Sequence, residues 1–480
     1  MAHLNIPFHG LNKLDIACIE AAREYLPDQV PSNDELTISG YESENPLRRL
    51  FDDENIFTEG GVGFLEGRET VLRLKFRILQ LVADLFPESE IEEPSLRVLG
   101  MGSFNIVVAV TLQDQAQRRD SGVGFGARVS RLLGMPPRTR KFALRIPRDK
   151  NGEMDGPPVS DVAGDIVTQR VISSCLGLPI PKIEKYDLGP TNALGRPYTL
   201  QTLLPGKNLH KLWLELSPQQ KASAIQQITQ TVENIAAVTT PAAGFVSLSN
   251  LINSRSSAIA LDQFPVPTNQ EAKKRPHFAQ PSQSPAPPQT PFGYLIDHCQ
   301  RWQKYEEEIG RASRNKNLWR ITIAVAKALD RRGWLGQRFH LTHGDLFPRN
   351  ILAKITSPGT VEITGIVDWD MACFAPKFVA LRPPFWAWVG HSMDERDEDL
   401  ATYEPPEGKF KTLKQAFRSA ASEDFIIFGL SRESAIARKL FRVVNSGLLG
   451  DRRYLALQLA EEWNALYPED KIGDLEAEWN

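Results

Sequence analysis

The sequence predicts an α+β protein of two lobes: a small β-rich lobe, then a larger helical lobe, with extra helices at both ends. Three observations predict this. In residues 96–110, β-branched residues continue after a pair of glycines, which favours strand, turn and strand. In residues 341–373, two apolar strands flank a Ser-Pro-Gly turn. Helical periodicity dominates the later segments 292–308, 316–333 and 412–467.

The bulk composition is that of an ordinary globular protein. The chain has 480 residues, a formal charge of −3 and 41% hydrophobic residues, which suffices for two lobes that each bury a core. The near-neutral charge disfavours a nucleic-acid partner. No apolar run is long enough to span a bilayer, so we expect no membrane partner. The oligomeric state is left open.

The cysteines and the N-terminus bear on location. Four cysteines are scattered along the chain without metal-ligand spacing, which favours a reducing compartment. The N-terminus lacks the basic-then-apolar layout of a secretory signal, and its early acidic residues disfavour a mitochondrial presequence. We expect a cytoplasmic protein, with a mitochondrial location left open.

The chain divides into an N-terminal extension and two lobes. The extension covers residues 1–94 and contains two helical patterns, at 11–26 and 68–86, which we interpret as a packing layer. The small lobe covers residues 95–205. The large lobe covers residues 206–480.

Two insertions interrupt these lobes. Residues 113–141 are rich in glycine and arginine and read as a solvated loop, with an electrostatic contact to a phosphate or an acidic partner as the alternative. Residues 252–291 carry many Pro, Ser and Gln residues and little apolar content, which predicts a mobile insertion.

The hairpin within residues 341–373 carries polar side chains at both ends. Asp345 and Asn350 stand at its start, and Asp368 stands at its finish. Because antiparallel strands place the start of one beside the finish of the other, these three residues should meet at one edge. Two carboxylates and an amide can hold a hard cation and leave one carboxylate as a base. The alternative is a hairpin with solvated acidic ends and His343 in the core.

The spacing in this hairpin is that of a phosphoryl-transfer catalytic loop, H-x-D-x-x-x-x-N, followed by a strand that delivers an Asp. The chain reads HGDLFPRN at 343–350 and IVDWD at 366–370. This resembles the aminoglycoside phosphotransferase family of small-molecule kinases. The resemblance implies a bilobal, protein-kinase-like fold and ATP-dependent transfer, with GTP as the alternative nucleotide. It implies that Asp345 is the catalytic base and that Asn350 and Asp368 hold Mg²⁺.

The first strands of the small lobe contain Gly100, Gly102 and Ser103. Small residues are needed where backbone approaches phosphate, and this turn could cover a nucleotide. Asn105 stands in place of the third glycine of the G-x-G-x-x-G pattern, so the match is partial. A plain β-turn is the alternative.

Arg145 stands where the resemblance places the kinase lysine. Arginine keeps the positive charge and can bind two phosphate oxygens, although its fork has a fixed geometry. The helix at 159–176 should supply the carboxylate that orients this cation, and Asp165 is the matching residue. Asp161 is the alternative, and an ordinary helix-surface acid is a third interpretation.

Residues 198–206 look like the last strand of the small lobe leading into the hinge. The resemblance implies that backbone groups around Gln201 and Leu203 bind the adenine ring. Ser217 then begins a helix with a capping-box pattern and Pro at the first helical position.

The region after Asp368 bears on the acceptor. The chain reaches 381–386 quickly, which leaves no room for a long activation segment, and Gly344 replaces the arginine that senses phosphate in protein kinases. Both features favour a small-molecule acceptor. The acidic loop 394–399 could attract a cationic acceptor, with a solvated loop as the alternative. Nearby aromatic residues read as core rather than as a cation-binding cage: Phe385, Trp386 and Trp388.

We therefore expect a kinase that phosphorylates a hydroxyl or amine of a small molecule, which the sequence does not identify. The alternative is a catalytically silent nucleotide-binding scaffold, which the departures at Asn105, Arg145 and Asp165 motivate. A protein-directed kinase is the third interpretation.

Overall fold

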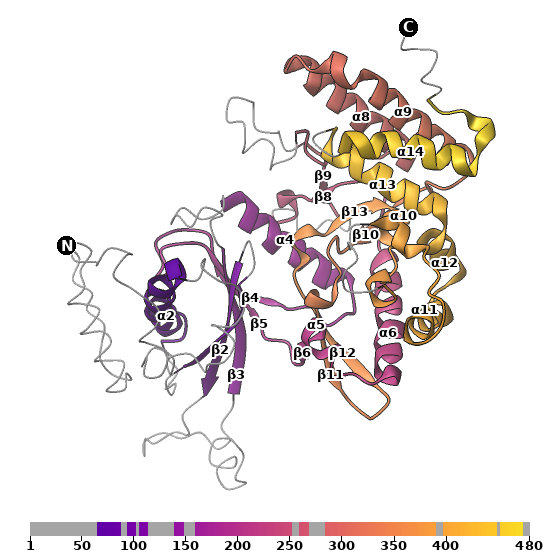
Figure 1. Ribbon diagram of the computed structural model, residues 1–480. Helices are drawn as coiled ribbons and strands as arrows, with labels where there is room; N and C mark the ends of the chain where they lie inside the picture. Colours follow the sequence, from indigo (N-terminus) through magenta and orange to yellow (C-terminus); the bar gives the residue numbers. More distant parts are fainter. Residues whose placement is uncertain are drawn as a thin grey trace, which may run out of the picture. The chain divides into compact units, whose positions relative to one another are not determined.

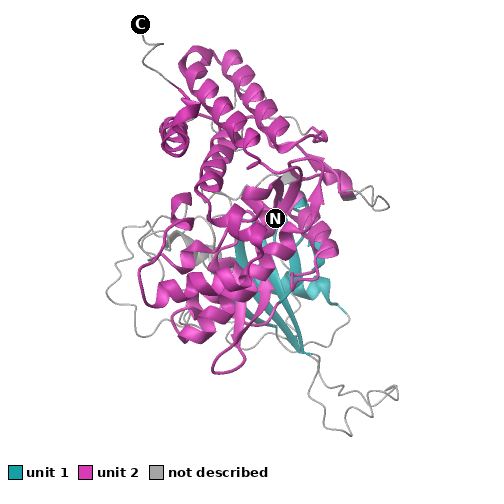
Figure 2. Ribbon diagram, turned by 90° about the vertical axis from the view of Figure 1, so that its right-hand side faces the viewer, with its two compact units in different colours: residues 1–163, 183–203 teal, residues 164–182, 204–480 magenta. Residues whose placement is uncertain are grey.

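The computed structural model describes nine segments of the chain, drawn in colour in Figure 1: residues 65–87, 94–101, 105–113, 139–147, 159–251, 259–267, 284–389, 397–448 and 452–473. They belong to two compact units (Figure 2). The sheet unit comprises residues 1–163 and 183–203, and the helical unit comprises residues 164–182 and 204–480. The predicted helix at 11–26 lies outside the described residues.

The sheet unit contains a five-stranded sheet in which every neighbouring pair is antiparallel. Its strands, in the order β1-β2-β3-β5-β4, are β1 (Ser95–Met101), β2 (Asn105–Gln113), β3 (Thr139–Pro147), β5 (Tyr198–Thr202) and β4 (Ile183–Asp187). Helix α2 (Leu65–Leu85) packs against this sheet through a shared apolar core (Figure 1). The predicted helix at 68–86 is therefore confirmed as a packing layer.

Strand β3 shows how this packing orients side chains. Leu144 and Ile146 are fully buried in the core that includes Ile78 and Leu81 of α2. Because side chains alternate along a strand, Arg145 lies on the opposite face of the sheet.

The helical unit contains most of the helices, and α4 (Val159–Cys175) crosses into it from the sheet unit. The remaining helices are α5 (Leu209–Leu212), α6 (Pro218–Ala236), α8 (Pro291–Glu308), α9 (Ala312–Arg331), α10 (Lys377–Ala380), α11 (Lys409–Ala420), α12 (Glu423–Leu430), α13 (Arg432–Ser446) and α14 (Arg452–Leu466). Helices α8, α9 and α14 lie side by side (Figure 1). The predicted α+β class, sheet-rich first and helical afterwards, is confirmed.

The described part of the helical unit also contains three small sheets. The first sheet contains β6 (Lys207–Asn208), β11 (Ile351–Ile355) and β12 (Val361–Ile366). The second contains β7 (Thr239–Thr240), β10 (Phe339–Thr342) and β13 (Cys373–Pro376). The third contains β8 (Phe245–Val246) and β9 (Leu261–Asp262). The predicted hairpin is β11–β12, with Ile351 opposite Ile366. Its first strand begins at Ile351, because Asn350 closes a 3₁₀ turn (Pro348–Asn350).

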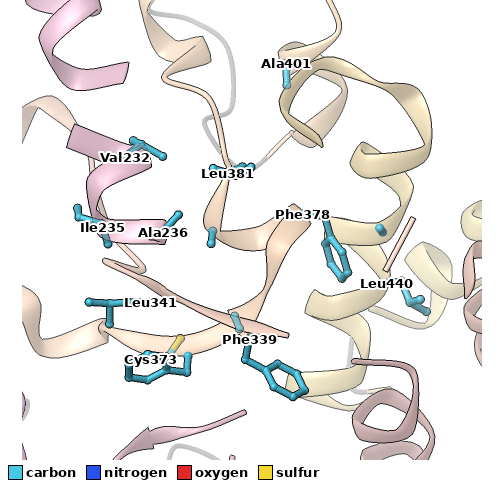
Figure 3. Packing of buried hydrophobic residues seen from close by; sticks show 14 of the residues in the cluster. Val232, Ile235, Ala236, Phe339, Leu341, Cys373, Phe378, Leu381, Ala401 and Leu440 are labelled. Carbon is cyan, nitrogen blue, oxygen red and sulfur yellow. The ribbon is translucent and has the colours of Figure 1, made fainter. Parts of the chain in front are cut away.

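Strand β10 runs through the core of the helical unit (Figure 3). Leu341 lies on the side of α6, and Phe339 lies toward Phe378 of α10 and Leu440 of α13. All four side chains are at most 5% exposed, so burial fixes the end of β10 from which the next loop starts.

Local sequence signals explain several element boundaries. Ser217 caps α6, with the reciprocal bonds of a capping box to Gln220, as the sequence predicts. Phe385 and Trp388 are at most 1% exposed, which confirms that they belong to the core. Among the helices of the described segments, none combines the length and apolar character needed to cross a bilayer.

Candidate active site

The loop that follows β10 begins with a left-handed residue. Gly344 has φ 77°, and a Cβ added there would overlap the carbonyl oxygen of Met371. No side chain fits, which gives a steric reason why this position cannot carry the arginine that protein kinases use. The turn brings Asp345 out at the end of the buried strand.

Asp345 and Asn350 are joined directly. The Asn350 side-chain nitrogen donates to the Asp345 backbone oxygen at 2.8 Å and to Asp345 Oδ2 at 2.8 Å. Asn350 is 5% exposed, whereas the Asp345 side chain is 27% exposed. A buried amide therefore holds a carboxylate that remains open to solvent.

Asp368 lies next to this pair along the hairpin. The Val367 N–H donates to the Asn350 carbonyl oxygen at 3.0 Å, which places Asp368 one residue from that contact. Asp368 itself is left-handed, with φ 67° and ψ 62°, a conformation that costs energy for a residue with a Cβ. The structure thus brings Asp345, Asn350 and Asp368 to one rim of the hairpin.

His343 connects both sides of this rim. Its Nε2 lies 3.0 Å from the Val367 carbonyl oxygen, and its Nδ1 accepts from the Asp345 N–H at 3.3 Å. Burial lowers the pKa of His343 to about 4, against smaller raising contributions from Val367 and from the Asp345 charge. The ring is therefore neutral at pH 7, with its proton on Nε2, and it packs 4.4 Å from the Trp369 ring.

Arg349 contacts the other oxygen of the candidate base. Its guanidinium nitrogen lies 2.6 Å from Asp345 Oδ1, and its Cζ lies 4.5 Å from the centre of the Phe347 ring. The backbone oxygen of Arg349 accepts a hydrogen bond from Asn208, which also caps α5. Both carboxylate oxygens of Asp345 are thus hydrogen-bonded, one to a cation and one to an amide.

The predicted nucleotide residues of the sheet unit have distinct environments. Gly100 lies in β1 beside a bulge, and a Cβ added there would meet nothing within 4 Å. Gln201 lies in β5, where it is buried, and its side-chain nitrogen donates to the Thr199 hydroxyl at 3.3 Å. The Leu203 N–H donates to the Lys141 carbonyl oxygen at 3.2 Å, so in this structure that donor is engaged by β3.

Arg145 and Asp165 occupy the elements that the sequence predicts. Arg145 is half-buried in β3 opposite Val107 and Thr199, and Asp165 is half-buried in α4. Gly102 and Ser103 lie outside the described residues.

The structure describes only residues 397–399 of the acidic loop, and Asp394 and Glu395 lie outside the described residues. The Glu398 side chain is 12% exposed, and it accepts from Arg382 at 3.0 Å and from Arg438 at 2.7 Å. Asp399 lies 2.6 Å from Lys439. Burial alone would raise the pKa of Glu398, but the two guanidinium groups outweigh burial and lower it. Both carboxylates are therefore paired with cations of the fold, although the Asp399 side chain is 58% exposed.

Two residues of the site have roles that the sequence interpretation did not assign. His343 was weighed only as a core residue, and Arg349 had no role. The signal for both lay within the motif, because residues at 343 and 349 flank Asp345 in a loop too short to carry them far from it. Within the described segments, no three His, Cys, Asp or Glu side chains form a metal site by themselves, so an ion held by Asn350 and Asp368 requires further ligands.

Solved structures similar to this chain include aminoglycoside phosphotransferases of low sequence identity. A GDP and kanamycin complex of APH(2″)-IIIa shares 16% identity and covers 84% of this chain and 99% of its own, at a TM-score of 0.37. An AMP-PNP and hygromycin B complex of APH(4)-Ia shares 14% identity and covers 80% and 97%, at 0.39. ADP-bound APH(2″)-Ib shares 10% identity and covers 82% and 97%, at 0.37. At such scores the similarity adds nothing to a functional assignment.

The family assignment comes from comparison of the sequence with protein-family models. No curated protein sequence matches the chain. The model of the phosphotransferase enzyme family APH matches residues 135–379, a range that includes both the Asp345 loop and the strand before Asp368. Because this range is more than half of the 480 residues, the chain belongs to the APH phosphotransferase enzyme family.

Proposed function

We propose that this protein transfers the terminal phosphoryl group of ATP, or of GTP, to a hydroxyl or amine of a small molecule. The observation that carries the proposal is the joining of Asp345 to Asn350 and of Asn350 to the residue before Asp368. Family membership supports the same class of reaction.

In this proposal Asp345 orients the acceptor and receives its proton. Its carboxylate is held at both oxygens, by Asn350 and by Arg349, so its orientation is set before the acceptor arrives. Such preorganisation matters because phosphoryl transfer depends mainly on positioning and on electrostatic stabilisation.

Asn350 and Asp368 fit a Mg²⁺ ion. The Asn350 side chain donates both hydrogen bonds to Asp345 through its nitrogen, so its amide oxygen would serve as one hard ligand and the Asp368 carboxylate as another. When bound, the ion would neutralise phosphate charge. The nucleotide itself would complete the ligand set, together with water.

The sheet unit would supply the nucleotide contacts. Gly100, Gly102 and Ser103 would approach the phosphates through their backbone, and Arg145, oriented by Asp165, would offset phosphate charge. The backbone around Gln201 and Leu203 would bind the base, and the Leu203 N–H, which in this structure donates to the Lys141 carbonyl oxygen, would have to exchange that partner.

The contact between Arg349 and Asp345 favours one alternative function, that of a catalytically silent nucleotide-binding scaffold. Arg349 already occupies Asp345 Oδ1, and the base must release or share this partner to accept a proton. A protein-directed kinase is disfavoured, because β13 follows Asp368 after four residues and leads directly into the buried helix α10.

A phosphate-release screen of a metabolite library with Mg²⁺ and either ATP or GTP tests the proposal. Wild type should turn over at least one acceptor, and Asp345→Asn should lose about 10²- to 10⁴-fold in kcat while still binding nucleotide. Equal turnover by Asp345→Asn would refute the role of the base. Background hydrolysis that is equal in wild type and Asp368→Ala, with nucleotide binding intact, would support the scaffold.

A further inference from the structure

The side of Asp345 away from Asn350 is cationic. Oδ2 of the carboxylate faces the Asn350 amide, whereas Oδ1 faces the Arg349 guanidinium at 2.6 Å. The Arg349 side chain is 48% exposed, so it reaches the same solvent-open side as the carboxylate. Any acceptor hydroxyl within hydrogen-bond reach of Oδ1, about 3 Å, is therefore no more than roughly 6 Å from that guanidinium.

A second guanidinium, that of Arg382, lies near the same aromatic ring as the guanidinium of Arg349. Arg382 has its Cζ 5.3 Å from the centre of the Phe347 ring, the ring that Arg349 also contacts. Arg382 is anchored through Nε to Glu398, and its side chain is 27% exposed. The Phe347 ring thus holds two cations next to the candidate base.

Two carboxylates of the described part of the acidic loop are paired with other cations. Glu398 is bonded to Arg382 and Arg438, and Asp399 is bonded to Lys439. Asp368 belongs to the proposed metal site. A polycationic acceptor would therefore meet like charge at Arg349.

We propose that the acceptor of this enzyme carries an anionic group, a carboxylate or a phosphate ester, beside the hydroxyl or amine that is phosphorylated, and that Arg349 selects it. This inference rests on the proposed function, because it takes Asp345 as the base. The planar guanidinium binds carboxylate and phosphate through paired hydrogen bonds. An arriving anion would share Arg349 and so release Asp345 Oδ1 for the acceptor proton.

The inference is tested by anion binding to the nucleotide-loaded protein. Loading with Mg²⁺ and AMP-PNP fills the site of the terminal phosphate, so that added anions report on the acceptor side. The loaded protein is titrated by calorimetry with inorganic phosphate, with malonate, and with 1,3-diaminopropane as the cationic counterpart of malonate. The titrations with inorganic phosphate and with malonate distinguish a phosphate ligand from a carboxylate ligand.

We expect wild type to bind at least one anion about tenfold more tightly than the diamine, and Arg349→Gln to lose most of this difference. Arg338→Gln removes an equal charge from an exposed position before β10 and should leave anion binding unchanged. With any acceptor from the library screen, Arg349→Gln should raise the acceptor KM about tenfold with the nucleotide KM within about twofold, and Arg349→Lys should recover part of the loss.

The inference alone would be overturned by nucleotide binding without saturable anion binding, or by equal anion affinities in wild type and Arg349→Gln. Tighter binding of the diamine than of both anions would do the same. Failure to bind both AMP-PNP and its guanosine counterpart GMP-PNP would instead overturn the proposed function, and the inference with it. Melting curves of Arg349→Gln that match wild type exclude a loss of fold as the cause.

Discussion

The imidazole Nε2 of His343 lies 3.0 Å from the backbone oxygen of Val367, the residue directly before Asp368. On the other side of the ring, Nδ1 accepts from the Asp345 N–H. One neutral imidazole therefore ties together the two segments that carry the proposed base and the proposed metal ligand. Protonation of Nδ1 would break the second of these bonds.

His343 should make stability depend on pH. Its pKa is lowered from 6.5 to about 4 by burial, so below pH 6.5 the unfolded state binds a proton that the folded state does not. Stability is then complete above pH 6.5 and is lost as the pH falls toward 4. Between about pH 7 and about pH 5 the loss should be about 2 kcal/mol, measurable by urea unfolding.

His343→Gln isolates this contribution. The glutamine amide can still donate to the Val367 oxygen but does not titrate, so the pH slope should decrease by about the amount expected for His343. His298 is also buried, with its pKa lowered by burial to about 3, and it should keep part of the slope. His210→Gln, at an exposed position in α5, is the control. An unchanged slope in His343→Gln would contradict the prediction.

Asp368 combines a backbone and a charge requirement, which two substitutions separate. Asn adopts the left-handed conformation nearly as readily as Asp, whereas Ala in this conformation is destabilised by the steric clash of its Cβ. Asp368→Asn should melt close to wild type, and Asp368→Ala should lose about 1 kcal/mol more. Both should lose Mg²⁺-dependent turnover, since each removes the carboxylate. Turnover retained in Asp368→Asn would show that the charge is not needed.

Gly344 should be intolerant of any side chain. Ala at this position meets both the left-handed φ of 77° and the Met371 carbonyl oxygen, so the loop that carries Asp345 would have to shift. We expect Gly344→Ala to lose about 2–4 kcal/mol of stability and most of the turnover.

Gly333→Ala is a matched control for Gly344→Ala. Gly333 has φ 79°, and a Cβ added there meets nothing within 4 Å, so Ala pays only the conformational cost of about 1–2 kcal/mol. Chemical denaturation of both variants measures the difference. If Gly344→Ala and Gly333→Ala lost equal stability, the overlap with Met371 would contribute nothing to the free energy of unfolding.

The candidate site was predictable from sequence where chemistry fixes residue type and spacing. Asp345, Asn350 and Asp368 follow from a motif whose hairpin geometry forces them to one rim, and the structure places them there. The capping box at Ser217 was equally readable, because both of its partners lie within four residues.

What the sequence did not indicate depends on contacts between distant segments. Glu398 looked like part of a solvated acidic run, and its burial depends on Arg438, 40 residues later in α13. The role of Arg349 depends on Phe347 and on the exact turn of Pro348–Asn350, which no periodicity reports.

The pair of Glu398 and Arg438 should be one of the costly places to substitute in the helical unit. Arg438 is 4% exposed, and its guanidinium also donates to the backbone oxygens of Phe378, Phe428 and Gly429. Arg438→Met leaves those three carbonyls without this donor and removes one of the two guanidinium groups that bind Glu398. The expected loss is about 3–5 kcal/mol.

The exposed pair of Lys354 and Glu362 on the β11–β12 hairpin is the matched comparison for Arg438. Its atoms lie 2.8 Å apart, as close as those of the buried pair, but the two side chains are 50% and 53% exposed. Water screens this pair, so Lys354→Met should cost less than about 1 kcal/mol. Urea unfolding of both variants measures the contrast. Because the distances are alike and the burial is not, similar losses would mean that burial does not determine the energy of the Glu398–Arg438 contact.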